Sequence, residues 1–187
     1  MSVEKFNETN EFSIIMLLDK TDAKKINHMR SLLPASPVRV DPPHLTLLRG
    51  ISSKTFVPDK ELAKEVGSIL QGILPGDMSA VVSDVRTADS RIYGKTSSVV
   101  FEASDKLLRL RGVVIQELSA RGYLVEEHEI KEYHPHATIT LSVPLPKEKD
   151  FSEFIKSGSV VGFSGFALLK MLIGSDGKRL TRIITPG

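Results

Sequence analysis

Two short stretches of this chain place a threonine two residues after a histidine, a combination suited to phosphate chemistry. The chain reads Pro-His-Leu-Thr-Leu over residues 43–47 and Pro-His-Ala-Thr-Ile over residues 135–139. Residues two apart on a β-strand share a face, so each histidine should project with its threonine, opposite the apolar residues. Two imidazoles with ordinary pKa values near 6.5 can serve at neutral pH as one general base and one general acid.

The two threonines complete a phosphodiester site. Their hydroxyls can donate hydrogen bonds to the non-bridging oxygens of a phosphate and stabilise the charge that develops there. In-line attack needs a base for the nucleophile and an acid for the leaving oxygen, and this set supplies both without a metal. We therefore predict that His44, Thr46, His136 and Thr138 form one catalytic site.

The segments before the two motifs follow the same order. An apolar strand over residues 12–18 leads through Asp19, a candidate cap, into an amphipathic helix, a loop and the strand that begins at His44. A second apolar strand from Val99 leads through Ser104 or Asp105, an amphipathic helix and a loop to His136. This similarity predicts an internal duplication whose two polar faces meet across a cleft.

The remaining segments alternate between helix and strand patterns. Apolar residues at helical spacing predict helices over residues 23–33, 58–73 and 107–118, with a short helical segment near 151–155. Apolar runs predict strands over residues 12–18, 44–51, 78–85, 97–103, 136–143, 166–173 and 180–184. The last two runs flank a Ser-Asp-Gly-Lys turn, which predicts a hairpin. We therefore expect an α+β protein, with residues 1–187 forming one domain of two pseudosymmetric lobes.

Composition excludes several classes of protein. The chain has 187 residues, of which 41% are hydrophobic, and the 25 Lys and Arg nearly balance the 23 Asp and Glu. A formal charge of +2 does not favour binding along a DNA duplex. The absence of cysteine excludes a disulfide framework, a thiolate nucleophile and a cysteine zinc site. With no apolar run of about 20 residues and a polar N-terminal segment, we expect a cytoplasmic monomer without a membrane partner, metal site or cofactor.

The two motifs and their surroundings resemble the 2H phosphoesterases, also called the LigT-like or 2′-5′ RNA ligase family. That family carries two His-hydrophobic-Thr/Ser-hydrophobic motifs, one in each lobe of a duplicated α+β fold. The resemblance covers most of the chain and implies antiparallel sheets on either side of a central cleft, with helices outside. Many bacterial members carry an arginine shortly after the second motif, where this chain has Leu141, while an arginine follows the first motif as Arg49.

The resemblance also implies a reaction and roles. A nucleotide or single-stranded RNA end with a 2′,3′-cyclic phosphate would be hydrolysed, with His136 activating water and His44 protonating the leaving oxygen. Cleavage or ligation of a 2′,5′-phosphodiester is the enzymatic alternative. A module that binds RNA ends without turnover is an alternative of a different class.

Four further residues are weaker candidates for contact with substrate. Tyr93 and Tyr133 could stack on a nucleobase, although each could equally be a packing residue. His134 could lie at the rim of the cleft. Thr140 continues the alternation of the second motif and could add a hydroxyl donor to the His136 face.

Overall fold

The computed structural model describes residues 6–34, 42–73, 78–90, 94–126, 133–146, 151–174 and 179–185. Its three helices within these ranges are α1 (Lys20–Ser31), α2 (Asp59–Ile73) and α3 (Asp105–Ala120). Its strands are β1 (Phe6–Leu18), β2 (His44–Ser52), β3 (Ser79–Ser90), β4 (Gly94–Phe101), β5 (Leu124–Val125), β6 (His136–Leu141), β7 (Val160–Gly174) and β8 (Arg179–Ile184). The α+β class is as expected.

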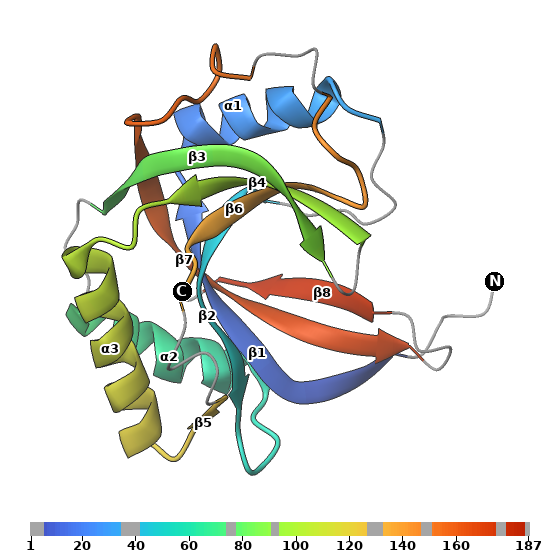
Figure 1. Ribbon diagram of the computed structural model, residues 1–187. Helices are drawn as coiled ribbons and strands as arrows, with labels where there is room; N and C mark the ends of the chain where they lie inside the picture. Colours follow the sequence, from blue (N-terminus) through green and yellow to red (C-terminus); the bar gives the residue numbers. More distant parts are fainter. Residues whose placement is uncertain are drawn as a thin grey trace.

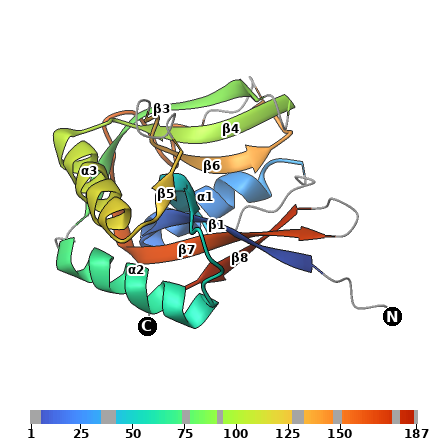
Figure 2. The same ribbon diagram turned by 90° about the horizontal axis from the view of Figure 1, so that it is seen from below.

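The strands form one antiparallel network in two groups. The order is β1-β2-β6-β4-β3-β7-β8, and β5 pairs with the end of β2. β7 joins the groups because it pairs with β3 through residues 160–162 and with β1 over most of its remaining length. Seen from below, β3, β4 and β6 lie on one side of the molecule and β1, β7 and β8 on the other (Figure 2).

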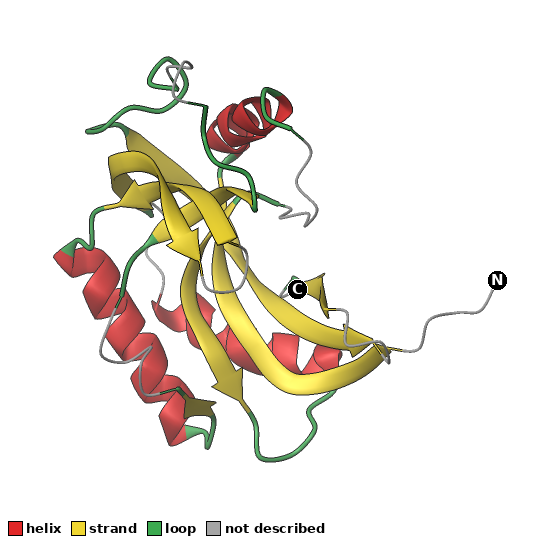
Figure 3. Cartoon of the chain, turned by 45° about the vertical axis from the view of Figure 1, so that its right-hand side comes forward, coloured by secondary structure: helices red, strands yellow, loops and turns green. Residues whose placement is uncertain are grey.

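The helices cross between the two groups of strands. α1 follows β1 but contacts β6, whereas α3 follows β4 but packs against α2. In Figure 1, α1 lies at the top beyond β3, β4 and β6, and α2 and α3 lie together beside β1 and β2. Figure 3 shows the same separation, with the strands between α1 and the other two helices. Each motif strand therefore has on its outer side a helix from the opposite half of the sequence.

Local sequence explains where the helices begin. Asp19 is the N-cap of α1, and its Oδ1 accepts a hydrogen bond from Asp22 N at 2.8 Å. Ser104 is the N-cap of α3 and accepts from Leu107 N at 3.3 Å. These bonds satisfy backbone N–H groups that have no partner within the first helical turn. Gly122, with φ of +83°, follows the end of α3 in the left-handed region that glycine tolerates.

Two expectations about secondary structure need correction. Residues 86–90 and 94–96, which lie outside the predicted strands 78–85 and 97–103, are also strand, because β3 and β4 remain paired out to Ser90 and Gly94. Cross-strand pairing compensates there for the scarcity of apolar residues. Residues 151–155 form turns rather than a helix, since Phe151 and Ile155 are buried anchors of a short connection. The hairpin of β7 and β8 is confirmed by their pairing.

The apolar face of each motif strand belongs to the main core. Leu45 and Leu47 of β2 and Ala137 of β6 are 0% exposed, and Ile139 of β6 is 1% exposed. No helix in the described part of the chain is long and apolar enough to cross a bilayer.

Candidate functional site

The two motif strands meet at a single point. β2 and β6 pair through Leu45 and Ala137, the residues between histidine and threonine in each motif. Extending this antiparallel register by one residue each way places His44 opposite Thr138, and Thr46 opposite His136. Side chains directly opposite one another have Cβ atoms about 4.5–5.5 Å apart, and diagonal neighbours about 7–8 Å apart. The two histidines are such a diagonal pair, with a threonine beside each.

Burial follows the predicted alternation in both motifs. His44, Thr46, His136 and Thr138 are half-buried, while the four residues between and after them are buried. All four polar side chains thus project from the face opposite the core. Among the described residues neither threonine hydroxyl has a recorded hydrogen bond, which leaves both for a ligand.

Backbone carbonyls fix the orientation of both imidazoles. His44 Nδ1 donates to Pro42 O at 2.7 Å, and His136 Nδ1 donates to His134 O at 2.8 Å. A carbonyl can only accept, so each ring carries a proton on Nδ1. In the neutral imidazole Nε2 is then the free base. The same bond, to the carbonyl two residues earlier, occurs in both motifs.

His44 has a pKa below its ordinary value. Burial is the main cause, because it disfavours the charged imidazolium. The positive charge of Arg30 and the neighbouring His136 lower the pKa further, while the hydrogen bond to Pro42 opposes these effects. At neutral pH the substrate-free protein therefore favours neutral His44.

An arginine from the opposite half of the chain contacts the backbone of each motif strand. Arg30 of α1 donates through Nε to Ile139 O and through Nη2 to Thr138 O, both at 2.9 Å. Arg111 of α3, which is only 4% exposed, donates through Nε to Leu47 O at 3.2 Å. Leu47 and Ile139 occupy the same position in their motifs, three residues after histidine.

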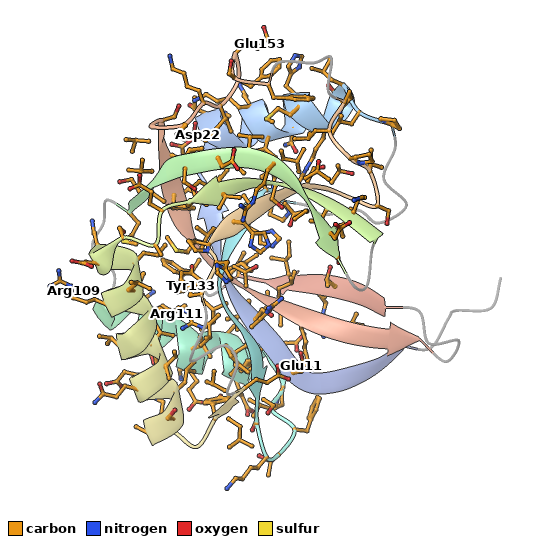
Figure 4. All side chains as sticks on the ribbon, viewed as in Figure 1. Glu11, Asp22, Arg109, Arg111, Tyr133 and Glu153 are labelled. Atoms are coloured by element: carbon orange, nitrogen blue, oxygen red, sulfur yellow. The ribbon has the colours of Figure 1, made fainter. Side chains whose placement is uncertain are left out.

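Tyr133 completes the contacts around the first motif. Its hydroxyl donates to Thr46 O at 3.2 Å, and the Arg111 guanidinium lies 4.7 Å from its ring centroid. Figure 4 shows Tyr133 and Arg111 close together between α3 and the motif strands. These contacts give Tyr133 a packing role, with one ring face covered by Arg111, and its contact with a nucleobase stays a prediction. Tyr93, the other stacking candidate, lies outside the described residues.

The expectation for Thr140 is wrong. A bulge in the β4–β6 pairing places Thr138 opposite Ser98 but Thr140 opposite Ser97, and both Thr140 and Ser97 are buried. One additional residue in β6 shifts the alternation, so Thr140 leaves the His136 face. In a regular strand consecutive carbonyls point in opposite directions. The bulge therefore also explains how one guanidinium contacts both Thr138 O and Ile139 O.

A pocket of about 260 Å³ adjoins His136. It is lined by His136 and His134, by alternate residues of β4 and by Arg86 on β3. The position of His134 at a cleft rim stays a prediction. Two larger cavities, of about 620 and 640 Å³, lie along α2 and beside residues 144–146 and 151–157, and neither histidine lines them. Within the described ranges, the structure brings together no three His, Asp or Glu side chains that could hold a metal ion.

Sequence reasoning missed the two arginines, although their spacing carries a signal. Ile26, Arg30 and Leu33 recur at intervals of four and three residues, as do Leu107, Arg111 and Val114. Each arginine therefore lies on the apolar stripe of its helix, where a charged group needs hydrogen-bond partners. That pattern indicates a buried contact, but only the structure identifies the carbonyls.

Comparisons with known proteins establish the fold. The structure is similar over 96% of this chain to E. coli LigT, with 17% sequence identity, 96% of that chain covered and a TM-score of 0.57. It is similar over 95% to a phosphoesterase with 15% identity, 97% coverage and a TM-score of 0.58. It is similar over 93% to TT0787 of Thermus thermophilus, with 18% identity, 94% coverage and a TM-score of 0.56. The LigT-like fold that the motifs implied is therefore confirmed.

No protein-family model matches the sequence. No curated protein matches it either.

Proposed function

We propose that this protein is a 2H-type phosphodiesterase that hydrolyses a 2′,3′-cyclic phosphate at a nucleotide or RNA end. The observation that carries the proposal is the junction of Leu45 and Ala137, beside which both histidines and both threonines project from one face. Support also comes from the shared fold with LigT, which has been crystallised with 3′-AMP, ATP and phosphate.

The proposed reaction uses each member of this set. The threonine hydroxyls hold the non-bridging oxygens of the phosphate. One histidine accepts a proton through Nε2 as water attacks phosphorus. The bond from phosphorus to one ribose oxygen then breaks, and the other histidine protonates that oxygen through Nε2. The product is a 2′- or 3′-monophosphate. Proton exchange with solvent then returns both histidines to their starting protonation states.

The two histidines need distinct roles. The resemblance implies that His136 is the base and His44 the acid. The lowered pKa of His44 favours the opposite assignment before substrate binds, because it makes the neutral, basic imidazole the prevailing form of His44 at neutral pH. An anionic phosphate bound beside His44 favours the imidazolium and so opposes this lowering of the His44 pKa.

The first test is direct assay of cleavage. Purified protein is incubated with nucleoside 2′,3′-cyclic phosphates and with a short RNA ending in a cyclic phosphate, in the presence of a chelator. We expect turnover that survives the chelator and falls by at least about 100-fold in both His44→Ala and His136→Ala, the scale of one general acid or base. A folded protein with no turnover would contradict cyclic phosphate hydrolysis and direct the assay to 2′,5′-linked dinucleotides or to RNA-end binding alone.

A second measurement assigns the roles. A phosphodiester with 4-nitrophenolate as leaving group needs little help from a general acid. The variant that lacks the acid should therefore keep much of its activity on this substrate, while the variant that lacks the base loses it on every substrate. Retained activity in His136→Gln would make His44 the base; retained activity in His44→Gln would support the roles implied by the resemblance.

A further inference from the structure

The pocket beside His136 holds a cation that no described part of the protein neutralises. Arg86 on β3 is exposed and has no recorded hydrogen bond or ion pair among the described residues. The other charged residue of the pocket, Asp89, binds Lys95 at 2.5 Å. Among the described residues that line this pocket, Arg86 is therefore the arginine or lysine whose charge can meet a ligand.

Sheet register places Arg86 on the same face as the candidate catalytic residues. Arg86 is opposite Ser98 on β4, and Ser98 is opposite Thr138 on β6. Two strand spacings of about 4.8 Å separate the backbones of Arg86 and Thr138 by about 10 Å. The Arg86 side chain therefore starts two strands away from Thr138, within range of a group attached to the reacting phosphate.

The size and lining of the pocket restrict that group. Its volume of about 260 Å³ lies just below the ~300–1,000 Å³ that typical ligand pockets enclose, and suits one nucleoside rather than several. Thr96 and Ser98 supply hydroxyls, and Ala88 and Val100 supply apolar contact. The pocket is therefore polar and charged at its Arg86 end, away from His136.

We infer that this pocket binds the nucleoside next to the reacting phosphate and that Arg86 binds a second phosphate carried by the same substrate. The inference rests on the proposed function and adds a substrate class to it. A guanidinium prefers phosphate because it donates two parallel hydrogen bonds to one group of oxygens. The second phosphate could be an internucleotide diester or a terminal monoester, which share this chemistry.

Three substrates and one variant test the inference. They are a nucleoside 2′,3′-cyclic phosphate, the same compound with a 5′-phosphate, and a dinucleotide with a cyclic phosphate end. Arg86→Gln should lower kcat/KM for the second-phosphate substrates by at least about 10-fold, the scale of one charge-assisted hydrogen bond. It should leave the first substrate within about twofold. If kcat/KM falls in Arg86→Gln for the dinucleotide alone, the phosphate that Arg86 binds is the internucleotide diester. If it falls for the 5′-phosphate compound alone, that phosphate is the terminal monoester.

The matched control is Arg109→Gln, because Arg109 is exposed on α3 and points away from the strands (Figure 4). Arg109→Gln should leave kcat/KM unchanged for all three substrates. Arg86→Lys should reduce kcat/KM less than Arg86→Gln does, because it keeps the charge. An equal loss on all three substrates, or no loss in Arg86→Gln, would overturn the inference.

Calorimetric binding separates this inference from the proposed reaction. Wild-type protein and Arg86→Gln are titrated with a nucleoside 3′-monophosphate and with a nucleoside 3′,5′-bisphosphate. Tighter binding of the bisphosphate that disappears in Arg86→Gln supports the subsite even if no substrate turns over. Equal affinities of wild-type protein for these two ligands and for a dinucleotide 3′-monophosphate would sink it whether or not the protein is an enzyme.

Discussion

At the scale of single residues, the two histidines share their anchoring but not their surroundings. Each Nδ1 donates to the carbonyl two residues earlier, which leaves Nε2 as the basic nitrogen of the neutral ring. Arg30 introduces asymmetry, because it contacts the second motif through hydrogen bonds and lowers the pKa of His44 in the first. One arginine thereby links the backbone position of one motif to the protonation of the other.

Removing that charge should raise the pKa of His44. In Arg30→Gln one of the causes that disfavour the imidazolium is lost, while burial, the largest cause, remains. Arg30→Lys keeps the charge and should leave the pKa of His44 closer to that of the wild type. A lysine cannot reproduce the two hydrogen bonds that the planar guanidinium donates to Ile139 O and Thr138 O. Proton NMR titration of the His44 ring measures this without any substrate. An unchanged or lowered pKa in Arg30→Gln, with Arg109→Gln as control, would contradict the assignment.

At the scale of elements, close packing attaches the start of α1 to β7. Asp22 Oδ2 accepts from Gly162 N at 3.0 Å, and Asp19 N donates to Gly162 O at 2.9 Å. A Cβ at residue 162 would lie 2.6 Å from Asp19 Oδ2. This contact positions the helix that carries Arg30, so a side chain at residue 162 would force the Asp19 carboxylate to shift.

We expect Gly162→Ala to lower the free energy of unfolding by about 1–3 kcal/mol, as overpacking does. Asp19→Ser together with Gly162→Ala should recover part of the loss, because serine caps the helix without the second carboxylate oxygen. Gly112→Ala is the matched control. A Cβ there meets no atom within 4 Å on exposed α3, so this change should stabilise by about 0.5–1 kcal/mol. Urea unfolding gives all three values, and a neutral Gly162→Ala would refute the packing argument.

At the scale of the whole molecule, charge is balanced and the candidate cations are few. A net charge of +2 gives little long-range attraction for RNA. Recognition should therefore depend on a few contacts near the junction of β2 and β6 rather than on an extended basic surface.

Salt dependence tests this view. For the dinucleotide with a cyclic end, log(kcat/KM) should fall against log[KCl] with a slope near −0.7, the value for about one phosphate contact on a single strand. The slope should be close to zero in Arg86→Gln. A slope steeper than about −2 would point to several further cations.

The sequence alone determined the features that depend on neighbouring residues. Alternation over 44–47 and 136–139 predicted which side chains share a face, and burial confirmed it. Asp19 was expected to cap the first helix, and Ser104 was one of two candidates, with Asp105, for the third, because capping is a bond to the next turn. The resemblance of the two motifs to a known family predicted the fold correctly, whereas the single duplicated domain and the catalytic roles stay predictions.

Only the tertiary structure decided what depends on contacts between distant segments. Pairing alone extended β3 and β4 to Ser90 and Gly94, and a bulge alone removed Thr140 from the His136 face. The crossing of α1 and α3 placed Arg30 and Arg111 on strands from the opposite halves of the chain. The spacing of apolar residues predicts which residues are buried, but it does not predict what they contact. Those contacts depend on how distant segments pack across the whole fold.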